Sequence, residues 1–151
     1  MTTQQAPHTP PMWRRVFSLP RTRLGWWAVG LSGLGLVFGR IFGIIQEGYG
    51  VGALITTALI MTLLITGLLG GGVVGAIALG AGERSLLVWV AQVPTALFFA
   101  FFTSFFLGQG GEGNYPLWVA PSLGVLFWAL IALGIIYLMR SAQRNNVRWF
   151  E

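Results

Sequence analysis

The chain has 151 residues, of which 55% are hydrophobic and only 9% are charged, whereas a soluble domain carries about 25% charged residues. All nine basic residues are arginines, the four acidic residues are glutamates, and the formal net charge is +5. The lack of cysteine and aspartate and the single histidine, His8, leave no ligand set for haem, copper or an iron–sulfur cluster. We therefore expect neither cofactor nor metal, and no enzymatic activity.

The N-terminal part divides into two segments. Residues 1–11 are rich in proline, threonine and glutamine and have little to bury, which predicts a disordered tail. Residues 12–23 interleave four arginines, including Arg14 and Arg15, with apolar side chains. Such a mixture is typical of a basic segment that lies at the headgroup boundary of a membrane.

Four long apolar stretches follow, and none has a titratable residue near its middle. They are Leu24–Ile45, Val51–Gly80, Leu86–Leu107 and Leu117–Met139. A helix of about 20 apolar residues matches the roughly 30 Å hydrocarbon core of a bilayer. The sequence therefore predicts an all-α integral membrane bundle of four transmembrane helices over residues 24–139, with a basic cytoplasmic helix extension over residues 140–151.

The arginines predict the orientation of this bundle. Four crossings that start in the cytoplasm place eight arginines inside and only Arg40 outside, as the positive-inside rule requires. Both termini are then cytoplasmic, the external loops lie near residues 46–50 and 108–116, and a short internal turn lies around residues 82–85. We interpret Glu83 and Arg84 in that turn as a solvated pair.

The second stretch is longer than a membrane requires. A helix over residues 51–80 would measure about 45 Å, and it contains three consecutive glycines, Gly70–Gly72. The helix either tilts, bends or breaks there, and broken helices bind ions in transporters. We favour a bent but continuous helix, because glycine is common in ordinary membrane helices.

Glycines at a spacing of four residues predict helix-packing faces. They are Gly35, Gly39 and Gly43 in the first stretch, and Gly67, Gly71 and Gly75 in the second. Missing side chains let two helices approach closely, and close packing stabilises helix pairs in lipid. The two stripes fall at different depths, so we expect each to receive side chains from the third or fourth helix, or from another subunit.

The third stretch carries a one-sided series of phenylalanines and a central proline. Phe98, Phe101, Phe102, Phe105 and Phe106 lie close to one helical face. This face is suited to the glycine grooves, to lipid, or to a quinone or pigment tail. Pro94 should kink the helix, with Gln92 and Thr95 available to satisfy the freed backbone groups.

Arginines supply the remaining candidate sites. Arg40 lies inside the first stretch, and Glu47 follows seven residues later near the same face, which suggests an intramembrane ion pair or simple anchoring. Arg140, Arg144 and Arg148 recur every four residues at the end of the chain. Together with Arg14 and Arg15, they are candidates for contact with anionic lipid headgroups or with an acidic surface of a partner subunit.

Two segments, each at a junction between basic and apolar sequence, resemble segments of other membrane proteins. The segments Pro20–Leu31 and Gly82–Trp89 contain a Pro-basic-Thr-basic-Leu-Gly opening and a Glu-Arg-Ser turn. They resemble segments of small uncharacterised bacterial membrane proteins with several spans. The resemblance implies a multi-pass protein of the bacterial cytoplasmic membrane, and it carries over no activity and no site residue.

These observations favour a non-catalytic role. We expect an accessory or structural subunit that packs against other membrane components, or against a second copy of itself, through its glycine faces, with anionic lipid and no nucleic acid among its partners. The alternative is a small oligomeric transporter or channel that uses the glycine-interrupted second helix. A lipid-modifying enzyme ranks third, because acid and base groups are missing from the apolar stretches.

Overall fold

The structure of the chain, a computed structural model, describes residues 19–46, 53–109 and 116–145, and within these ranges all regular secondary structure is helical. The helices are α2 (Arg23–Gln46), α3 (Ala53–Gly80), α4 (Leu86–Val90), α5 (Gln92–Gln109) and α6 (Val119–Arg144). The expected tail, most of the basic segment that follows it, Glu47 and the greater part of both expected external loops lie outside the described residues.

Four of these helical segments are long and apolar enough to cross a membrane. They are Arg23–Ile44, Thr56–Gly80, Leu86–Leu107 and Val119–Arg144. The predicted all-helical class with four membrane-length segments is thus confirmed. The third segment combines α4 and α5. Helix α6 continues past the apolar stretch that ends at Met139, so that Arg140 and Arg144, which lie in the predicted helix extension, belong to the helix.

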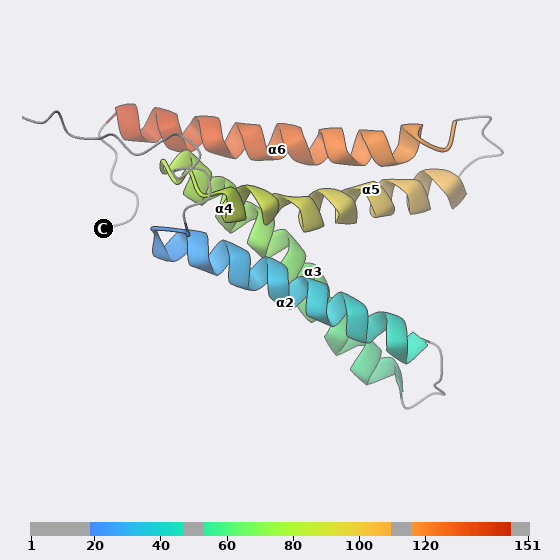
Figure 1. Cartoon of the computed structure of the whole chain (residues 1–151). Helices are drawn as coiled ribbons and strands as arrows, with labels where there is room; N and C mark the ends of the chain where they lie inside the picture. Colours follow the sequence, from blue (N-terminus) through green and yellow to red (C-terminus); the bar gives the residue numbers. More distant parts are fainter. Residues whose placement is uncertain (1–18, 47–52, 110–115, 146–151) are drawn as a thin grey trace, which may run out of the picture.

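The helices form two pairs that diverge from one end of the molecule (Figure 1). Helix α2 packs along α3, α5 packs along α6, and α3 contacts both helices of the second pair. The start of α2, the turn between α3 and α4 and the last turns of α6 lie at the end where the pairs meet. We call this the basal end, and the opposite end, where the pairs spread apart, the distal end.

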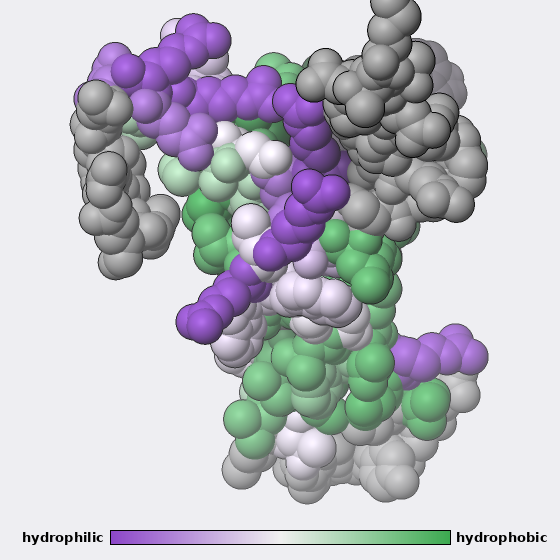
Figure 2. Space-filling view, turned by 60° about the vertical axis from the view of Figure 1, so that its left-hand side comes forward, coloured by the Kyte–Doolittle hydropathy of each residue, from purple (hydrophilic) through white to green (hydrophobic). Residues whose placement is uncertain are grey.

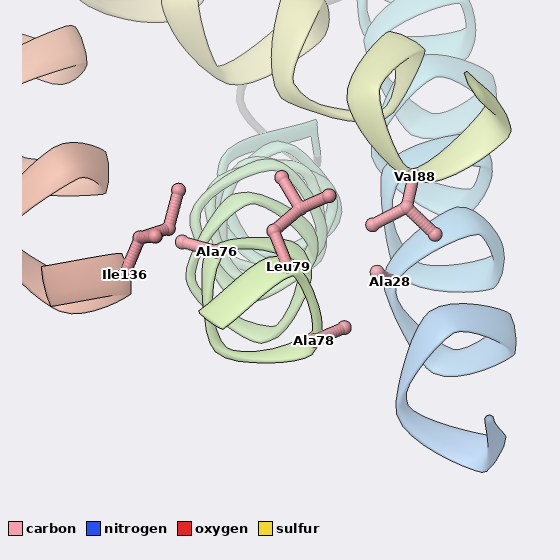
Figure 3. Packing of buried hydrophobic residues seen from close by; sticks show 6 residues of the cluster. All are labelled: Ala28, Ala76, Ala78, Leu79, Val88 and Ile136. Carbon is pink, nitrogen blue, oxygen red and sulfur yellow. The ribbon is translucent and has the colours of Figure 1, made fainter. Parts of the chain in front are cut away.

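Small residues on the C-terminal half of α3 explain why the pairs meet at the basal end. A Cβ built on Gly80 would lie 2.6 Å from the Cβ of Met139 in α6, so only a glycine fits there. Ala76 and Ala78 are fully buried beside Leu79, Val88 and Ile136 (Figure 3). The N-terminal half of α3 carries larger residues such as Met61 and Leu64, which do not permit the same close approach.

The break in the bundle lies in the third segment rather than in the second. Helix α3 runs without interruption through Gly70–Gly72, which confirms the continuous helix that we favoured. The third segment is divided at Ala91, between α4 and α5. Pro94 explains this position, because a proline has no N–H to donate to the carbonyl four residues earlier, and its ring clashes with that carbonyl, here the one of Val90.

Candidate functional site

Helices α2 and α3 approach each other most closely where two glycines meet. A Cβ built on Gly67 would lie 2.8 Å from the Cα of Gly35, and one built on Gly35 would lie 2.8 Å from the backbone nitrogen of Leu68. Nearer the basal end, Gly71 lies against Ser32, and Gly75 lies against Ala28. The face of α3 with glycines 67, 71 and 75 is therefore covered by α2.

This pairing overturns the expectation that the two glycine stripes need partners elsewhere. The stripes are offset along the helix axes, as their depths implied, but they overlap at Gly35 and Gly67. We missed that Ala28 and Ser32 continue the small-residue face of α2 toward the basal end. The first stripe also ends earlier than predicted: Gly39 lies against Leu64, whereas no described atom outside the local helix lies within 4 Å of a Cβ built on Gly43.

A buried carboxylate joins the start of α2 to the turn between α3 and α4. One oxygen of Glu83, Oε2, accepts hydrogen bonds from the N–H of Arg21 (3.0 Å), the N–H of Thr22 (2.9 Å) and the hydroxyl of Thr22 (2.9 Å). The hydroxyl of Thr22 in turn accepts a bond from the N–H of Gly25 (3.0 Å), as an N-cap residue does. We call this arrangement the Glu83 capping site.

The capping site corrects our interpretation of Glu83 and Arg84 as a solvated pair. Glu83 is only 7% exposed. Its bonds go to backbone N–H groups and a hydroxyl, including the N–H of Arg84 at 3.3 Å. Burial by itself would raise the pKa of this carboxyl, but the hydrogen bonds from Thr22, Arg21 and Arg84 outweigh burial and hold the pKa below its ordinary value.

A local signal for this site exists in the sequence. In a capping box, an N-cap threonine is followed three residues later by a glutamate that returns to the N-cap N–H. Here Gly25 occupies that position, and Glu83 makes the equivalent contact from another part of the chain. Gly25 leaves room for this arrangement, because a Cβ at that position would lie 2.9 Å from the Cβ of Pro20 and 3.3 Å from Glu83 Oε2.

Hydroxyl groups bridge the helices around the break in the third segment. Ser32 in α2 donates to the carbonyl of Ala91 at the break (3.0 Å), and Thr95 in α5 donates to the carbonyl of Leu68 in α3 (2.7 Å). Both side chains are buried. We expected Gln92 and Thr95 to satisfy the backbone groups freed by Pro94. The hydroxyl of Thr95 instead bonds to a neighbouring helix.

Two further side chains have buried polar atoms next to the glycines of α3. The amide nitrogen of Gln92 lies against Gly75, and the indole of Trp128 lies against Gly72. Neither the amide group of Gln92 nor the indole nitrogen of Trp128 has a hydrogen-bond partner among the described residues. The Trp128 ring stacks on Phe99 with a centroid distance of 5.6 Å, which aligns α6 with α5.

An apolar cleft opens between the two helix pairs toward the distal end. Its volume is about 590 Å³, and its lining comes from three helices. The lining residues are Phe42 of α2, Met61, Leu64 and Ile65 of α3, and Phe98, Phe101, Phe102, Phe105 and Phe106 of α5. We call it the phenylalanine cleft. It contains no titratable side chain, so its chemistry is limited to the binding of apolar groups.

The structure excludes one of the three roles that the phenylalanine series left open, which is packing into the glycine grooves. The rings do not fill the glycine grooves, because α2 and α3 already cover each other there. Phe101 remains 71% exposed and Phe105 51% exposed. The rings of Phe102 and Phe106 pack against each other with centroids 4.4 Å apart, so that the wall formed by α5 is continuous and aromatic.

The arginines separate into two groups. Among the described residues, Arg21, Arg23, Arg84, Arg140 and Arg144 lie at the basal end, and only Arg40 lies in the distal half. Figure 2 shows hydrophilic residues gathered toward one end of the molecule, with an apolar surface beyond them. Arg40 is exposed on α2, and the suggested ion pair with Glu47 falls outside the described residues, as do Arg14, Arg15 and Arg148.

Comparisons with known proteins add no assignment. Comparison of the chain with protein-family models, with curated proteins and with solved structures finds no match. Within the described ranges, no three histidine, cysteine, aspartate or glutamate residues gather as metal ligands would. A function for this chain must therefore be inferred from its own sequence and structure.

Proposed function

We propose that this chain is an accessory subunit of a membrane complex, and that its phenylalanine cleft receives an apolar transmembrane segment of another protein. The single observation that carries this proposal is the cleft itself. It is lined by aromatic and aliphatic side chains from α2, α3 and α5, and the described chain does not fill it. Aromatic residues and methionine are enriched in protein interfaces, where they bury large areas.

The surroundings of the cleft support membrane insertion with the basal end in the cytoplasm. Five described arginines lie at the basal end, which agrees with the positive-inside rule. Trp26, Trp27 and Trp89 are each more than half exposed near that end, and Trp118 is 68% exposed at the distal end. Tryptophan favours the two interfaces of a bilayer, so these residues mark both edges of the apolar belt.

The transporter alternative rested on an interrupted second helix. Because α3 is continuous through its three glycines, it has neither the two facing helix ends nor the unpaired backbone carbonyls that bind an ion in a broken helix. At the break that does occur, between α4 and α5, Ser32 donates a hydrogen bond to the carbonyl of Ala91. The accessory role is therefore the function that this geometry supports best.

A crosslinking experiment in native membranes tests the proposal. A photoreactive phenylalanine analogue is introduced at Phe101, which lines the cleft, and in a matched variant at Leu130, which is 61% exposed on α6 and is not part of the lining. We expect a defined adduct with a different membrane protein at Phe101 and not at Leu130. Adducts with lipid alone, with a second copy of this chain, or with the same protein equally at both positions would contradict the proposal.

A further inference from the structure

The last turns of α6 combine an apolar part with two exposed arginines. We propose that this surface binds the anionic headgroup of a phospholipid, with Arg140 and Arg144 holding the phosphate. The inference does not depend on the phenylalanine cleft, which lies in the distal half of the molecule.

The site is a hollow along one face of α6. Its volume is about 610 Å³, and its lining includes Leu133, Ile136, Tyr137, Arg140, Ser141 and Arg144. These residues follow one another at alternating intervals of three and one positions, so they share one face of the helix. The face changes along the helix axis from apolar, through a tyrosine, to cationic and hydroxyl-bearing.

The two arginines are free to bind an anion. Both side chains are exposed, and no carboxylate among the described residues forms an ion pair with either of them. The one acid described at the basal end, Glu83, accepts its bonds from backbone N–H groups and from Thr22. The neighbouring Arg84 adds positive charge at the same end of the bundle, so the local field attracts anions.

The position of the hollow favours a lipid over a dissolved phosphate. Gly80, the last residue of α3, touches Ile136 and Met139 of α6, which places this level of α6 at the end of a membrane-length helix. Arg140 and Arg144 follow within the next two turns, at the depth of the headgroups in the proposed orientation. Tyr137, which is 72% exposed, lies at the boundary, as interfacial aromatic residues do.

The chemistry of the pair suits a phosphodiester. A guanidinium offers parallel N–H donors that match two phosphate oxygens, and two guanidinium groups four residues apart lie on the same helix face. Leu133 and Ile136 continue the hollow toward the bilayer interior, where an acyl chain would follow the headgroup. A soluble phosphate would gain nothing from this apolar half.

The experiment measures lipid retention by native mass spectrometry of the full chain, released from detergent in the presence of phosphatidylglycerol or phosphatidylcholine. We expect selective retention of phosphatidylglycerol. Each arginine near a membrane surface contributes about a fivefold increase in anionic lipid binding, so the double variant Arg140→Gln/Arg144→Gln should bind phosphatidylglycerol about 25-fold more weakly.

Matched variants distinguish a specific phospholipid site from nonspecific attraction between arginines and anionic lipid. Arg40→Gln removes an exposed arginine in the distal half and should leave retention of phosphatidylglycerol unchanged. The variant Arg140→Lys/Arg144→Lys keeps the charge but loses the paired donors, so it should fall between the wild type and the double glutamine variant. Circular dichroism checks that each variant keeps its helix content.

Several results would overturn the inference. They are equal retention of both lipids, an equal loss in Arg40→Gln, and displacement of phosphatidylglycerol by an equal concentration of glycerol phosphate, which would indicate a site for a soluble anion. Loss of an acidic protein partner in the double glutamine variant without any change in lipid retention would likewise assign the arginines to protein docking.

Discussion

The contact between Gly67 and Gly35 makes a sharp prediction about stability. In Gly67→Ala, the added methyl group would lie 2.8 Å from both the Cα and the nitrogen of Gly35, and 3.0 Å from the carbonyl oxygen of Leu31. Carbon atoms in ordinary contact are separated by about 3.5–4.0 Å. All three neighbouring atoms belong to the backbone, so no side chain can turn aside and α2 must move away from α3 by about 1 Å.

The magnitude follows from two opposing effects. Overpacking of this kind costs about 1–3 kcal/mol, while replacing a helical glycine by alanine gains up to about 1 kcal/mol. We therefore expect Gly67→Ala to lower the free energy of unfolding by about 1–2 kcal/mol. The matched control is Gly33→Ala in α2, where no described atom outside the local helix lies within 4 Å of the new Cβ, and where only the gain should appear.

Unfolding of the chain in mixed micelles with increasing dodecyl sulfate measures both variants, and the seven tryptophans provide the fluorescence signal. The difference between the variants, about 2 kcal/mol, is more informative than either value alone because it cancels the helix-propensity gain common to both. If Gly67→Ala proved as stable as Gly33→Ala, the close approach of α2 and α3 at Gly35 would be refuted.

Three further predictions concern the buried polar contacts and the orientation. Glu83→Gln should lower the free energy of unfolding by about 1 kcal/mol, because a carboxylate accepts stronger hydrogen bonds than an amide. Since the pKa of Glu83 is lowered in the folded state, its carboxylate stabilises the wild type above about pH 4, and this stabilisation is lost as the pH falls through the folded pKa. The variant should lack this loss of stability at low pH. Thr95→Val should lower the free energy of unfolding by about 0.6 kcal/mol, and at most by about 1.7 kcal/mol, because it loses the hydrogen bond to α3. Thr62→Val loses only a bond within its own helix and should change the free energy of unfolding little. Equal losses in the two variants would argue against the hydrogen bond between Thr95 and α3. The chain has no cysteine, so an impermeant maleimide should label Leu117→Cys in intact cells and Asn145→Cys only after lysis, and labelling of the latter in intact cells would reverse the proposed orientation.

Much of the local structure could be read from residue types. Apolar length predicted the four membrane-length segments, and Pro94 predicted an irregularity that the structure places three residues before it, at Ala91. The glycines at spacing four correctly marked faces that tolerate close approach at Gly35 and Gly67. These predictions succeed because helix formation and helix breaking depend on neighbours within about four residues.

The partners of those faces could not be read in the same way. Periodicity says which side of a helix is small, but it does not say which helix will lie against it. The same is true of Glu83, which looks like an ordinary turn residue until the start of α2 is brought beside it. Thr22 can be recognised locally as an N-cap residue, but no local pattern identifies Glu83, about sixty positions away, as its partner.

The sequence alone therefore determined that the chain forms four helical segments long and apolar enough to cross a membrane, and where an interruption or a charge falls in them. The tertiary structure decided that α3 lies between α2 and the α5–α6 pair, because small residues on two faces of its basal half admit both. Larger side chains on its distal half hold α5 away. The phenylalanine cleft exists because of that difference along a single helix.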